Sequence, residues 1–215
     1  MNQKNGKNSL GLDICFEDEP NPIVLFKKWF ATAEKSETND PNALSLATSS
    51  SDGIPSVRMV LLKGLSDSGF VFYTNFDSKK SNDLKSNPNA SMCFHWKSIR
   101  RQIRVSGRVS SVDKEEADKY FDSRDYGSKI SAWASSQSKV MKSKNEFLDK
   151  IKEFEKKFPD KNNVPRPPHW SGWRVEPHNI EFWLEIKNRI HERLNYKKKK
   201  RKVDKRNTLS LKRSI

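Results

Sequence analysis

An alternation of apolar and polar side chains runs through residues 180–194, and it constrains the fold more than any other feature of the chain. Even-numbered positions are mostly apolar and odd-numbered positions are mostly polar. Successive side chains of a strand point to opposite faces of a sheet, so the pattern predicts half-buried β-strand, with Asn188 at a bend between two short strands. A helix is the alternative, because Ile186, Ile190 and Leu194 also lie four residues apart.

Strand geometry would place Arg189, His191 and Arg193 together on one face. Like charges this close repel each other unless water screens them or an anion lies among them. A solvated strand face is the ordinary explanation of such a pattern. An anionic ligand is the functional explanation, and the rest of the chain has to supply a reason for one.

Shorter alternating segments precede this one, and several are bounded by turn-forming residues. The Asp52-Gly53 turn joins the first two segments as a hairpin. Strands are predicted over residues 43–49, 55–65, 69–75, 90–96, 101–112, 171–176 and 179–186.

Helices are predicted between these strands. Asn21 and Pro22 are typical of an N-cap and a first helical residue, and Asp113 with Glu116 is typical of a capping box. The predicted helices cover Pro22 to about Lys35, 78–87, Asp113 to Phe121, a short piece after Ser128, and Val140 to Phe158. Roughly six or seven short strands with helices between them predict a mainly β fold with peripheral helices, namely a small antiparallel β-barrel.

Composition divides the chain into a loose polar segment at 1–20, one domain at 21–195 and a basic tail at 196–215. The net charge is +15, and residues 187–213 hold 13 Lys and Arg against two acidic residues. The run KKKKRKV (197–203) is similar to a nuclear-import signal and would attract nucleic-acid phosphates in a salt-dependent manner. A disordered, solvated tail is the commoner explanation, so nucleic-acid binding is the alternative function and not the leading one.

The sequence gives no sign of a metal site, a disulfide framework or a membrane segment. Cys15 and Cys93 are far apart, and the four His residues lack metal-ligand spacing. No apolar run is long enough for a membrane span, and residues 1–20 lack a signal-peptide core. We therefore expect a cytoplasmic protein with no metal and no membrane partner.

Two pairs of cations are placed where they could meet a phosphate. Strict alternation would put Arg58 and Lys63 on opposite faces, so both can serve one site only if the strand bends or ends between them. Lys79 and Lys80 follow Ser78, a residue suited to capping a helix. The first turn of a helix is already partly positive, so a bound anion would relieve the repulsion there, although a solvated pair fits this stretch equally well.

A third stretch adds neutral and cationic phosphate donors. Tyr120 and Arg124 lie four residues apart on one face of a predicted helix, and Ser128 follows. An ordinary capped helix end with surface polar groups is the alternative for this stretch taken alone.

Taken in order, these stretches resemble the pyridoxamine 5'-phosphate oxidase family over roughly residues 20–195. The matching motifs are RMVLLK (58–63), FYTNFDSKK (72–80), RRQIRVSG (100–107), YFDSR with the later Ser, Ala-Trp and Gln-Ser (120–138), and EFW with NRIHER (181–193). The resemblance implies an FMN-binding split β-barrel that forms a homodimer with FMN at the interface. The implied activity is oxidation of pyridoxine 5'-phosphate or pyridoxamine 5'-phosphate to pyridoxal 5'-phosphate in vitamin B6 biosynthesis, with O2 as acceptor and H2O2 as product.

Residue roles follow from the resemblance alone. FMN would be held by Arg58, Met59, Val60, Leu61, Leu62, Lys63, Tyr73, Thr74, Lys79, Lys80, Gln102, Gln137, Ser138, Trp183 and Arg193. The substrate would be held by Lys63, Tyr120, Arg124, Ser128, Arg189, Ile190 and His191. Arg189 and His191 would be catalytic, because they would lie against the substrate ring and its reacting carbon. Hydride would pass from C4′ of the substrate to N5 of the flavin, so orientation and electrostatics are expected to dominate.

The sequence departs from the family pattern in a few places. Lys79 stands where Arg is usual, which loses a bidentate fork, and Ile190 replaces Leu. The family's final strand is expected to be lost or replaced, since the chain ends NYKKKKRKVDKRNTLSLKRSI instead of with a Trp and a terminal Arg-Leu-x-Pro. A split-barrel flavoprotein of other or impaired activity is therefore the second hypothesis.

Overall fold

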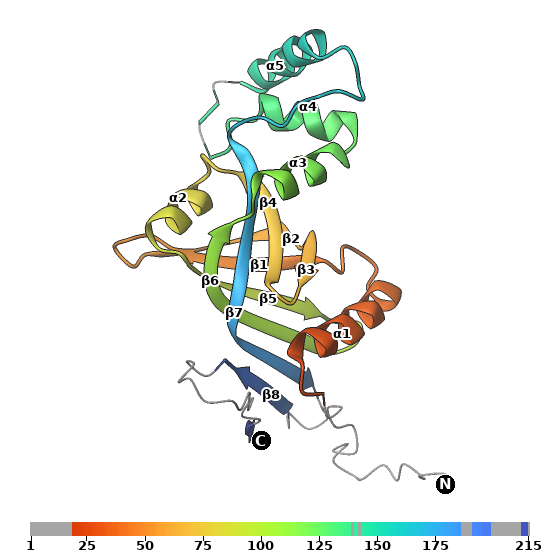
Figure 1. Cartoon of the computed structure of the whole chain (residues 1–215), viewed down its shortest axis with the longest axis vertical. Helices are drawn as coiled ribbons and strands as arrows, with labels where there is room; N and C mark the ends of the chain where they lie inside the picture. The colour runs from red at the N-terminus through yellow and green to blue at the C-terminus, as the bar shows by residue number, and fades with distance from the viewer. Residues whose placement is uncertain (1–18, 139, 142, 186–190, 199–211, 215) are drawn as a thin grey trace.

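The computed structural model describes residues 19–138, 140–141, 143–185, 191–198 and 212–214 (Figure 1). Its helices are α1 (Pro22–Ser36), α2 (Lys79–Ser86), α3 (Lys114–Asp122), α4 (Tyr126–Ala134) and α5 (Lys144–Lys157). Its strands are β1 (Ala43–Ser49), β2 (Pro55–Leu61), β3 (Gly64–Ser66), β4 (Gly69–Asn75), β5 (Asn89–Trp96), β6 (Arg101–Ser111), β7 (Trp170–Glu185), β8 (His191–Lys197) and β9 (Lys212–Ser214). The prediction of a mainly β fold with peripheral helices is confirmed.

The strands form one antiparallel sheet in the order β2-β1-β5-β6-β7-β4-β3, with β8 on β7 and β9 on β8. β7 pairs with β6 along one edge. On its other edge, residues 170–175 pair with β4 and residues 179–185 pair with β8. The sheet therefore divides into two arms at β7, and this strand passes through both of them.

Of three hydrophobic clusters among the described residues, two hold most of the helices to the sheet. In the larger one, the Phe26 ring of α1 lies 5.0 Å from the rings of Phe70 and Phe94, and Trp29 lies 5.2 Å from Phe182. All of these are buried, and each buried aromatic of this size stabilises the fold by about 2–3 kcal/mol. The smaller cluster, around Phe121, Ile130 and Trp170, joins α3, α4 and α5 at the opposite end of the molecule from α1 (Figure 1).

Side chains cap the helices largely as predicted. The Asn21 Oδ1 atom accepts a hydrogen bond from the Ile23 amide at 2.9 Å, and Asp113 Oδ1 accepts one from the Glu116 amide at 2.7 Å. The helix expected after Ser128 begins earlier, because Asp125 caps it at Tyr126. The helix expected from Val140 begins later, because Ser143 caps it and α5 starts at Lys144. Both predicted starts were wrong, because each helix begins directly after its capping residue, Asp125 or Ser143.

The strand predictions hold with two corrections. The predicted strand over 55–65 is two strands, because β2 ends at Leu61 and β3 begins at Gly64. The predicted strands over 171–176 and 179–186 are one strand, β7, with a register shift where Gly107 of β6 lies opposite Pro177. A Pro that lacks an amide hydrogen is tolerated in a strand at such an irregularity.

The alternation is confirmed as strand over 180–185 and 191–194, and the helix alternative is wrong for these described residues. Ile180, Phe182, Leu184, Leu194 and Tyr196 are buried, and β7 and β8 pair antiparallel, with Glu185 opposite His191. The bend expected at Asn188 lies outside the described residues, as do Arg189 and Ile190.

The C-terminal end of the sheet differs from the prediction. β8 continues to Lys197, beyond the predicted domain boundary at 195, and β9 pairs with it, with Ser214 opposite Arg193. A final strand of three residues is therefore present, which fits a replaced final strand and not a lost one. In the part of the chain that the structure describes, no helix is long and apolar enough to cross a bilayer.

Gly107 sits where β6 and β7 change register, and a side chain there has no room. A Cβ atom on Gly107 would lie 2.1 Å from the Glu176 carbonyl oxygen, a backbone atom that can move only by breaking the β6–β7 ladder. We expect Gly107→Ala to lower the free energy of unfolding by about 1–3 kcal/mol, measured by urea denaturation. Gly127→Ala is the matched control, because its nearest neighbour is the Asp125 side chain at 3.4 Å. Equal losses in both variants would contradict this account.

Candidate functional site

A pocket of about 250 Å³ lies where the ends of β2, β4 and β7 meet α3. Ten of the residues predicted to bind FMN or substrate line it: Met59, Val60, Leu61, Lys63, Tyr73, Thr74, Lys80, Tyr120, Arg124 and Gln137. Residues of β2, β4, α2 and α3, with Lys63, Arg124 and Gln137 from the segments between elements, therefore meet in one place. Trp170 also lines the pocket and was not predicted, because the sequence placed it at the end of a loop with only its aromatic ring as a signal.

Lys63 reaches this pocket because β2 ends before it. The Lys63 amide leaves the β1–β2 hairpin and donates a hydrogen bond to the Val71 carbonyl on β4 at 2.8 Å. The sequence allowed Arg58 and Lys63 to serve one site only if the strand bends or ends between them, and β2 does end between them, at Leu61. Arg58 itself does not line the pocket; its guanidinium lies behind the pocket wall, beside α2.

Lys80 is a buried ammonium group held by neutral oxygens. Its Nζ atom donates hydrogen bonds to Thr74 Oγ1 at 2.9 Å, Gln137 Oε1 at 2.8 Å and Ser78 Oγ at 3.2 Å. No carboxylate of the described residues forms an ion pair with it. Burial, and then the charge of Arg58, lower the pKa of Lys80 to about 8. An anion bound in the pocket would compensate the positive charge of Lys80, which no described carboxylate pairs with.

The prediction that the Ser78 side chain caps α2 is wrong. Ser78 occupies the N-cap position, but its hydroxyl makes no capping bond and donates instead to the Asn75 carbonyl at 2.7 Å. Its oxygen accepts from Lys80, so the residue supports the ammonium group and leaves amide groups of the first helical turn open to an anion.

Aromatic rings form the opposite wall. The Tyr73 ring stacks with those of Tyr120, at 3.9 Å, and Trp170, at 5.2 Å, and all three rings are nearly parallel. The Arg124 guanidinium lies over the Trp170 ring at 4.8 Å. Its Nη1 atom is buried and has no hydrogen-bond partner among the described residues. Burial also lowers the pKa of Arg124 and raises that of Tyr73 to about 12. A buried guanidinium N–H without an acceptor is suited to a phosphate oxygen.

A second group of predicted residues lies at the far end of the sheet. Gln102, Trp183 and Arg193 face one another across β6, β7 and β8. Trp183 lies thirteen positions after Trp170 on β7, which corresponds to roughly 40 Å along an extended strand. Within one chain, this group cannot touch a ligand that fills the pocket.

His191 belongs to the second group. Its ring centre lies 4.7 Å from that of Trp183, and its Nδ1 atom is buried without a hydrogen-bond partner in the described part of the chain. Arg193 forms an ion pair with Glu181 at 3.1 Å. Arg189 and Ile190 lie outside the described residues, so the predicted row of Arg189, His191 and Arg193 is seen only in part.

The remaining predicted residues lie near the pocket without lining it. Lys79 forms an ion pair with Asp83 at 3.3 Å, and its amide donates to Ser138 Oγ at 3.3 Å. Leu62 is buried in the main core. The Ser128 amide donates to Asp125 Oδ1, so this residue serves the start of α4 and is not brought into the pocket.

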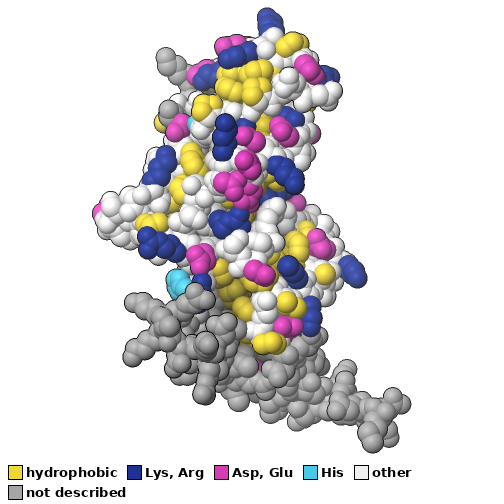
Figure 2. All heavy atoms as spheres, in the orientation of Figure 1, with side chains coloured by type: hydrophobic (Ala, Val, Ile, Leu, Met, Phe, Trp, Pro, Cys, Tyr) yellow, Lys and Arg dark blue, Asp and Glu magenta, His cyan; other side chains and the backbone are white. Residues whose placement is uncertain are grey.

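The visible surface does not form an extended basic patch. On the face shown in Figure 2, Lys and Arg side chains are interspersed with Asp and Glu over the described residues. At the start of the basic run, Lys198 forms an ion pair with Glu176 at 2.6 Å. Most of the run lies outside the described residues, so its predicted attraction to nucleic acid stays a prediction.

Comparisons with known proteins agree with this geometry. A family model described as pyridoxamine 5'-phosphate oxidase matches residues 31–158, and one described as the pyridoxine 5'-phosphate oxidase C-terminal dimerisation region matches residues 170–210. A pyridoxine/pyridoxamine 5'-phosphate oxidase of Pelagibacter ubique is 57% identical over 194 residues, which cover 90% of this chain and 93% of that protein. One from Sphingopyxis alaskensis is 53% identical over 173 residues, which cover 80% of each.

Solved structures support the split-barrel prediction. PhzG from Burkholderia lata 383, solved in complex with tetrahydrophenazine-1-carboxylic acid, has a TM-score of 0.85 at 30% identity, covering 94% of this chain and 98% of that one. An FMN-binding protein of Nostoc punctiforme, related to pyridoxamine 5'-phosphate oxidase, has a TM-score of 0.68 at 14% identity, covering 91% and 97%. The second likeness shows the fold alone. The predicted antiparallel split β-barrel is thus confirmed.

The lowered pKa of Lys80 predicts a pH dependence. A phosphate dianion favours the ammonium form, so affinity for FMN should be constant below about pH 8 and fall as the pH rises above the pKa of about 8. Without ligand, the unfolded chain keeps this proton up to its ordinary pKa of 10.5, so the contribution of Lys80 to stability rises between about pH 8 and 10.5.

Titration of flavin fluorescence with protein from about pH 6.5 to 9.5 measures this dependence. Lys80→Gln should weaken binding and remove the fall near pH 8. Lys79→Gln is the control, because it removes an exposed cation of the same helical turn and should keep the fall. A fall that persists in Lys80→Gln would assign it to another group.

Proposed function

Because this chain belongs to the pyridoxamine 5'-phosphate oxidase family, we propose that its pocket and the row of residues at the far end of β7 together form the active site of that reaction. The chain uses FMN to oxidise pyridoxine 5'-phosphate or pyridoxamine 5'-phosphate to pyridoxal 5'-phosphate. The observation that carries the site assignment is a pair of cations in one pocket, the buried Lys80 and Arg124 with its buried Nη1 atom, neither of which forms an ion pair with a described carboxylate.

Each cation has neighbours suited to one phosphate. Lys80, with Thr74 and Gln137 around it and Arg58 behind it, would hold the FMN phosphate. Arg124 and Tyr120, with Lys63 across the pocket, would hold the phosphate of the substrate. Arg–phosphate hydrogen bonds are among the strongest polar contacts available to a protein, which suits a substrate that must be held by one end.

The pocket of a single chain is too small for both ligands. Its volume of about 250 Å³ falls below the roughly 300–1,000 Å³ of ligand pockets in general. Val57, Met59 and Leu61 on the edge strand β2 are 68%, 62% and 37% exposed, and the last two also line the pocket. Exposed apolar side chains on an edge strand are normally covered by another element or another chain.

The chain forms a homodimer, and we place the FMN site between its two copies. Gln102, Trp183 and Arg193 of one copy would complete the pocket of its partner, since they are too distant within their own chain. His191 would come with them and lie against the substrate. Each dimer then has two equivalent sites, as two-fold symmetry requires.

When bound, FMN would supply the hydride acceptor for the substrate and the route of the electrons to O2. The protein contributes orientation, because Arg124 and Tyr120 fix the substrate phosphate at one end. The stacked rings of Tyr73, Tyr120 and Trp170 keep water from that side of the pocket. No carboxylate or imidazole of the described residues lines the pocket, so in this arrangement His191 of the partner subunit brings an imidazole to the reacting carbon. Its unpaired Nδ1 leaves it able to donate or accept one hydrogen bond there.

Mixed dimers test the shared site. Arg124→Ala and His191→Ala subunits should each form slow homodimers, and His191→Ala should keep FMN bound. Mixing them under conditions that exchange subunits should restore about a quarter of the wild-type activity, since half of the dimers then carry one intact site of two. If both residues served a site within one chain, every site in the mixture would stay defective and no activity would return.

Arg124→Lys tests the substrate phosphate site. Lysine keeps the charge and loses the fork, so KM for pyridoxine 5'-phosphate should rise about tenfold or more while FMN affinity is unchanged. Arg108→Lys, on the exposed side of β6, is the matched control and should leave both values as they are. A loss of FMN affinity in Arg124→Lys would mean that Arg124 serves the cofactor.

A further inference from the structure

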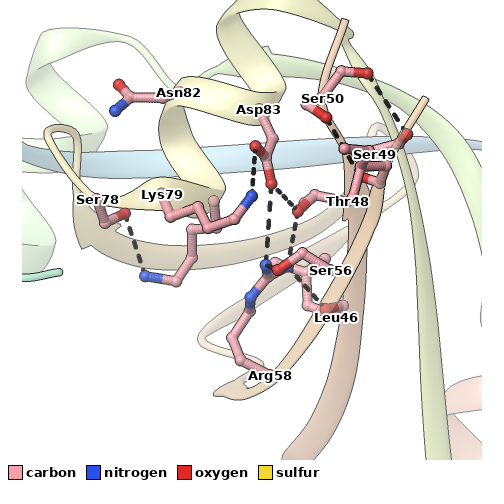
Figure 3. Close-up of polar contacts among 12 residues, drawn as sticks. Leu46, Thr48, Ser49, Ser50, Ser56, Arg58, Ser78, Lys79, Asn82 and Asp83 are labelled. Carbon is pink, nitrogen blue, oxygen red and sulfur yellow. Dashed lines mark hydrogen bonds and ion pairs between the residues drawn. The ribbon is translucent and has the colours of Figure 1, made fainter. Parts of the chain in front are cut away.

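A buried carboxylate lies inside the group of cations assigned to the FMN phosphate. Asp83 is 4% exposed and lies one turn after Lys79 on α2. Its Oδ2 atom accepts a hydrogen bond from Thr48 Oγ1 at 2.7 Å, and its Oδ1 atom lies 3.3 Å from Lys79 Nζ (Figure 3). The Arg58 guanidinium lies 3.9 Å away. An acid at the centre of an anion site needs an explanation, since it repels the ligand.

The net charge of this group still favours an anion when Asp83 is included. Arg58, Lys79 and Lys80 carry three positive charges at neutral pH, and Asp83 carries one negative charge. The group therefore has a net charge near +2, which is opposite to the charge of about −1.5 to −2 on a phosphate monoester. Without Asp83, three cations would repel one another at a partly buried site whenever the phosphate is absent.

Asp83 is not needed to hold Arg58 in place. Arg58 Nη1 donates to the Leu46 carbonyl at 3.0 Å and to Thr48 Oγ1 at 2.7 Å, and Nη2 donates to Ser56 Oγ. These three acceptors fix the guanidinium, while 3.9 Å to Asp83 is too long for a hydrogen bond. Arg58 and Asp83 therefore interact through their charges and not through a hydrogen bond.

Lys79 differs from Arg58, because Asp83 is its partner. The Lys79 side chain is 58% exposed, and it extends along α2 so that its ammonium group meets the carboxylate one turn further on (Figure 3). A phosphate placed at the start of α2 would compete with Asp83 for this lysine. The carboxylate thus lowers the net attraction that the cations can offer to the ligand.

We propose that Asp83 is the resident counterion of the FMN phosphate site. It stabilises the subunit before FMN arrives, and it makes FMN binding weaker than the three cations alone would allow. The inference rests on the assignment of Lys80 and its neighbours to the FMN phosphate.

Asp83→Asn removes the charge and keeps an oxygen that can accept from Thr48. The unliganded variant should unfold at a lower temperature than the wild type. Its Kd for FMN, measured by fluorescence titration at low ionic strength, should be about three- to tenfold lower, and the difference should shrink as salt is added. An unchanged or higher Kd would overturn the proposal. Asp83→Ser provides the same test if the Asn variant does not fold.

A second variant separates a local counterion from the total charge of the protein. Asn82 is the neighbouring residue on α2, and its side chain points away from the cations (Figure 3). The double variant Asn82→Asp with Asp83→Asn restores the net charge without restoring the counterion. It should bind FMN as tightly as Asp83→Asn. A return to the wild-type Kd would show that only the total charge matters.

Failure of the site assignment has a different signature. If Lys80→Gln and Arg58→Gln both bind FMN with the wild-type Kd, these residues do not hold the phosphate and the proposed function of the pocket is wrong. If both bind FMN weakly while Asp83→Asn shows no gain, the phosphate site stands and the counterion proposal fails alone.

Discussion

The pairing of β7 with three other strands is the constraint on which the rest of the structure depends. One edge is occupied by β6, and the other is shared between β4 and β8. Because the same strand runs through both arms of the sheet, it fixes the distance between them. Trp170 at its start belongs to the pocket, and Trp183 near its end belongs to the second group. In the proposed shared site, the separation that calls for two chains is therefore set by the length of a single strand.

In the pocket, cations that would bind a ligand lower the stability of the unliganded fold. Lys80 and the Nη1 atom of Arg124 are buried, and no described carboxylate forms an ion pair with either cation. By contrast, Arg166 and Arg174, outside the pocket, form close ion pairs with Asp118 and Glu116. Among the described residues, these two arginines therefore have carboxylate partners and the two pocket cations do not. Such a difference between sites is typical of groups that wait for a ligand.

Local signals in the sequence predicted most of the elements, and the resemblance predicted most of the pocket. Capping residues such as Asn21 and Asp113 act over three residues or fewer, so their effect can be read directly. The continuity of β7 could not be read, because Pro177 normally ends a strand and only the register shift opposite Gly107 accommodates it. Asp83 and Trp170 were missed because their roles depend on partners from distant elements, and neither belongs to a local pattern. The sequence motifs did not show that Lys80 and Arg193 lie far apart within one chain, because a motif gives residue types and their spacing but no distance in space.

The exposed apolar side chains of β2 give the protein a dependence on its own concentration. In the arrangement proposed here, Val57, Met59 and Leu61 are covered only when a subunit has met its partner. A newly made subunit instead displays an unpaired strand edge with apolar side chains, which is a template for aggregation. Its survival then depends on how fast it finds a second copy, and that rate falls as fewer copies are made. At low expression, the number of usable enzymes would fall faster than the number of chains synthesised.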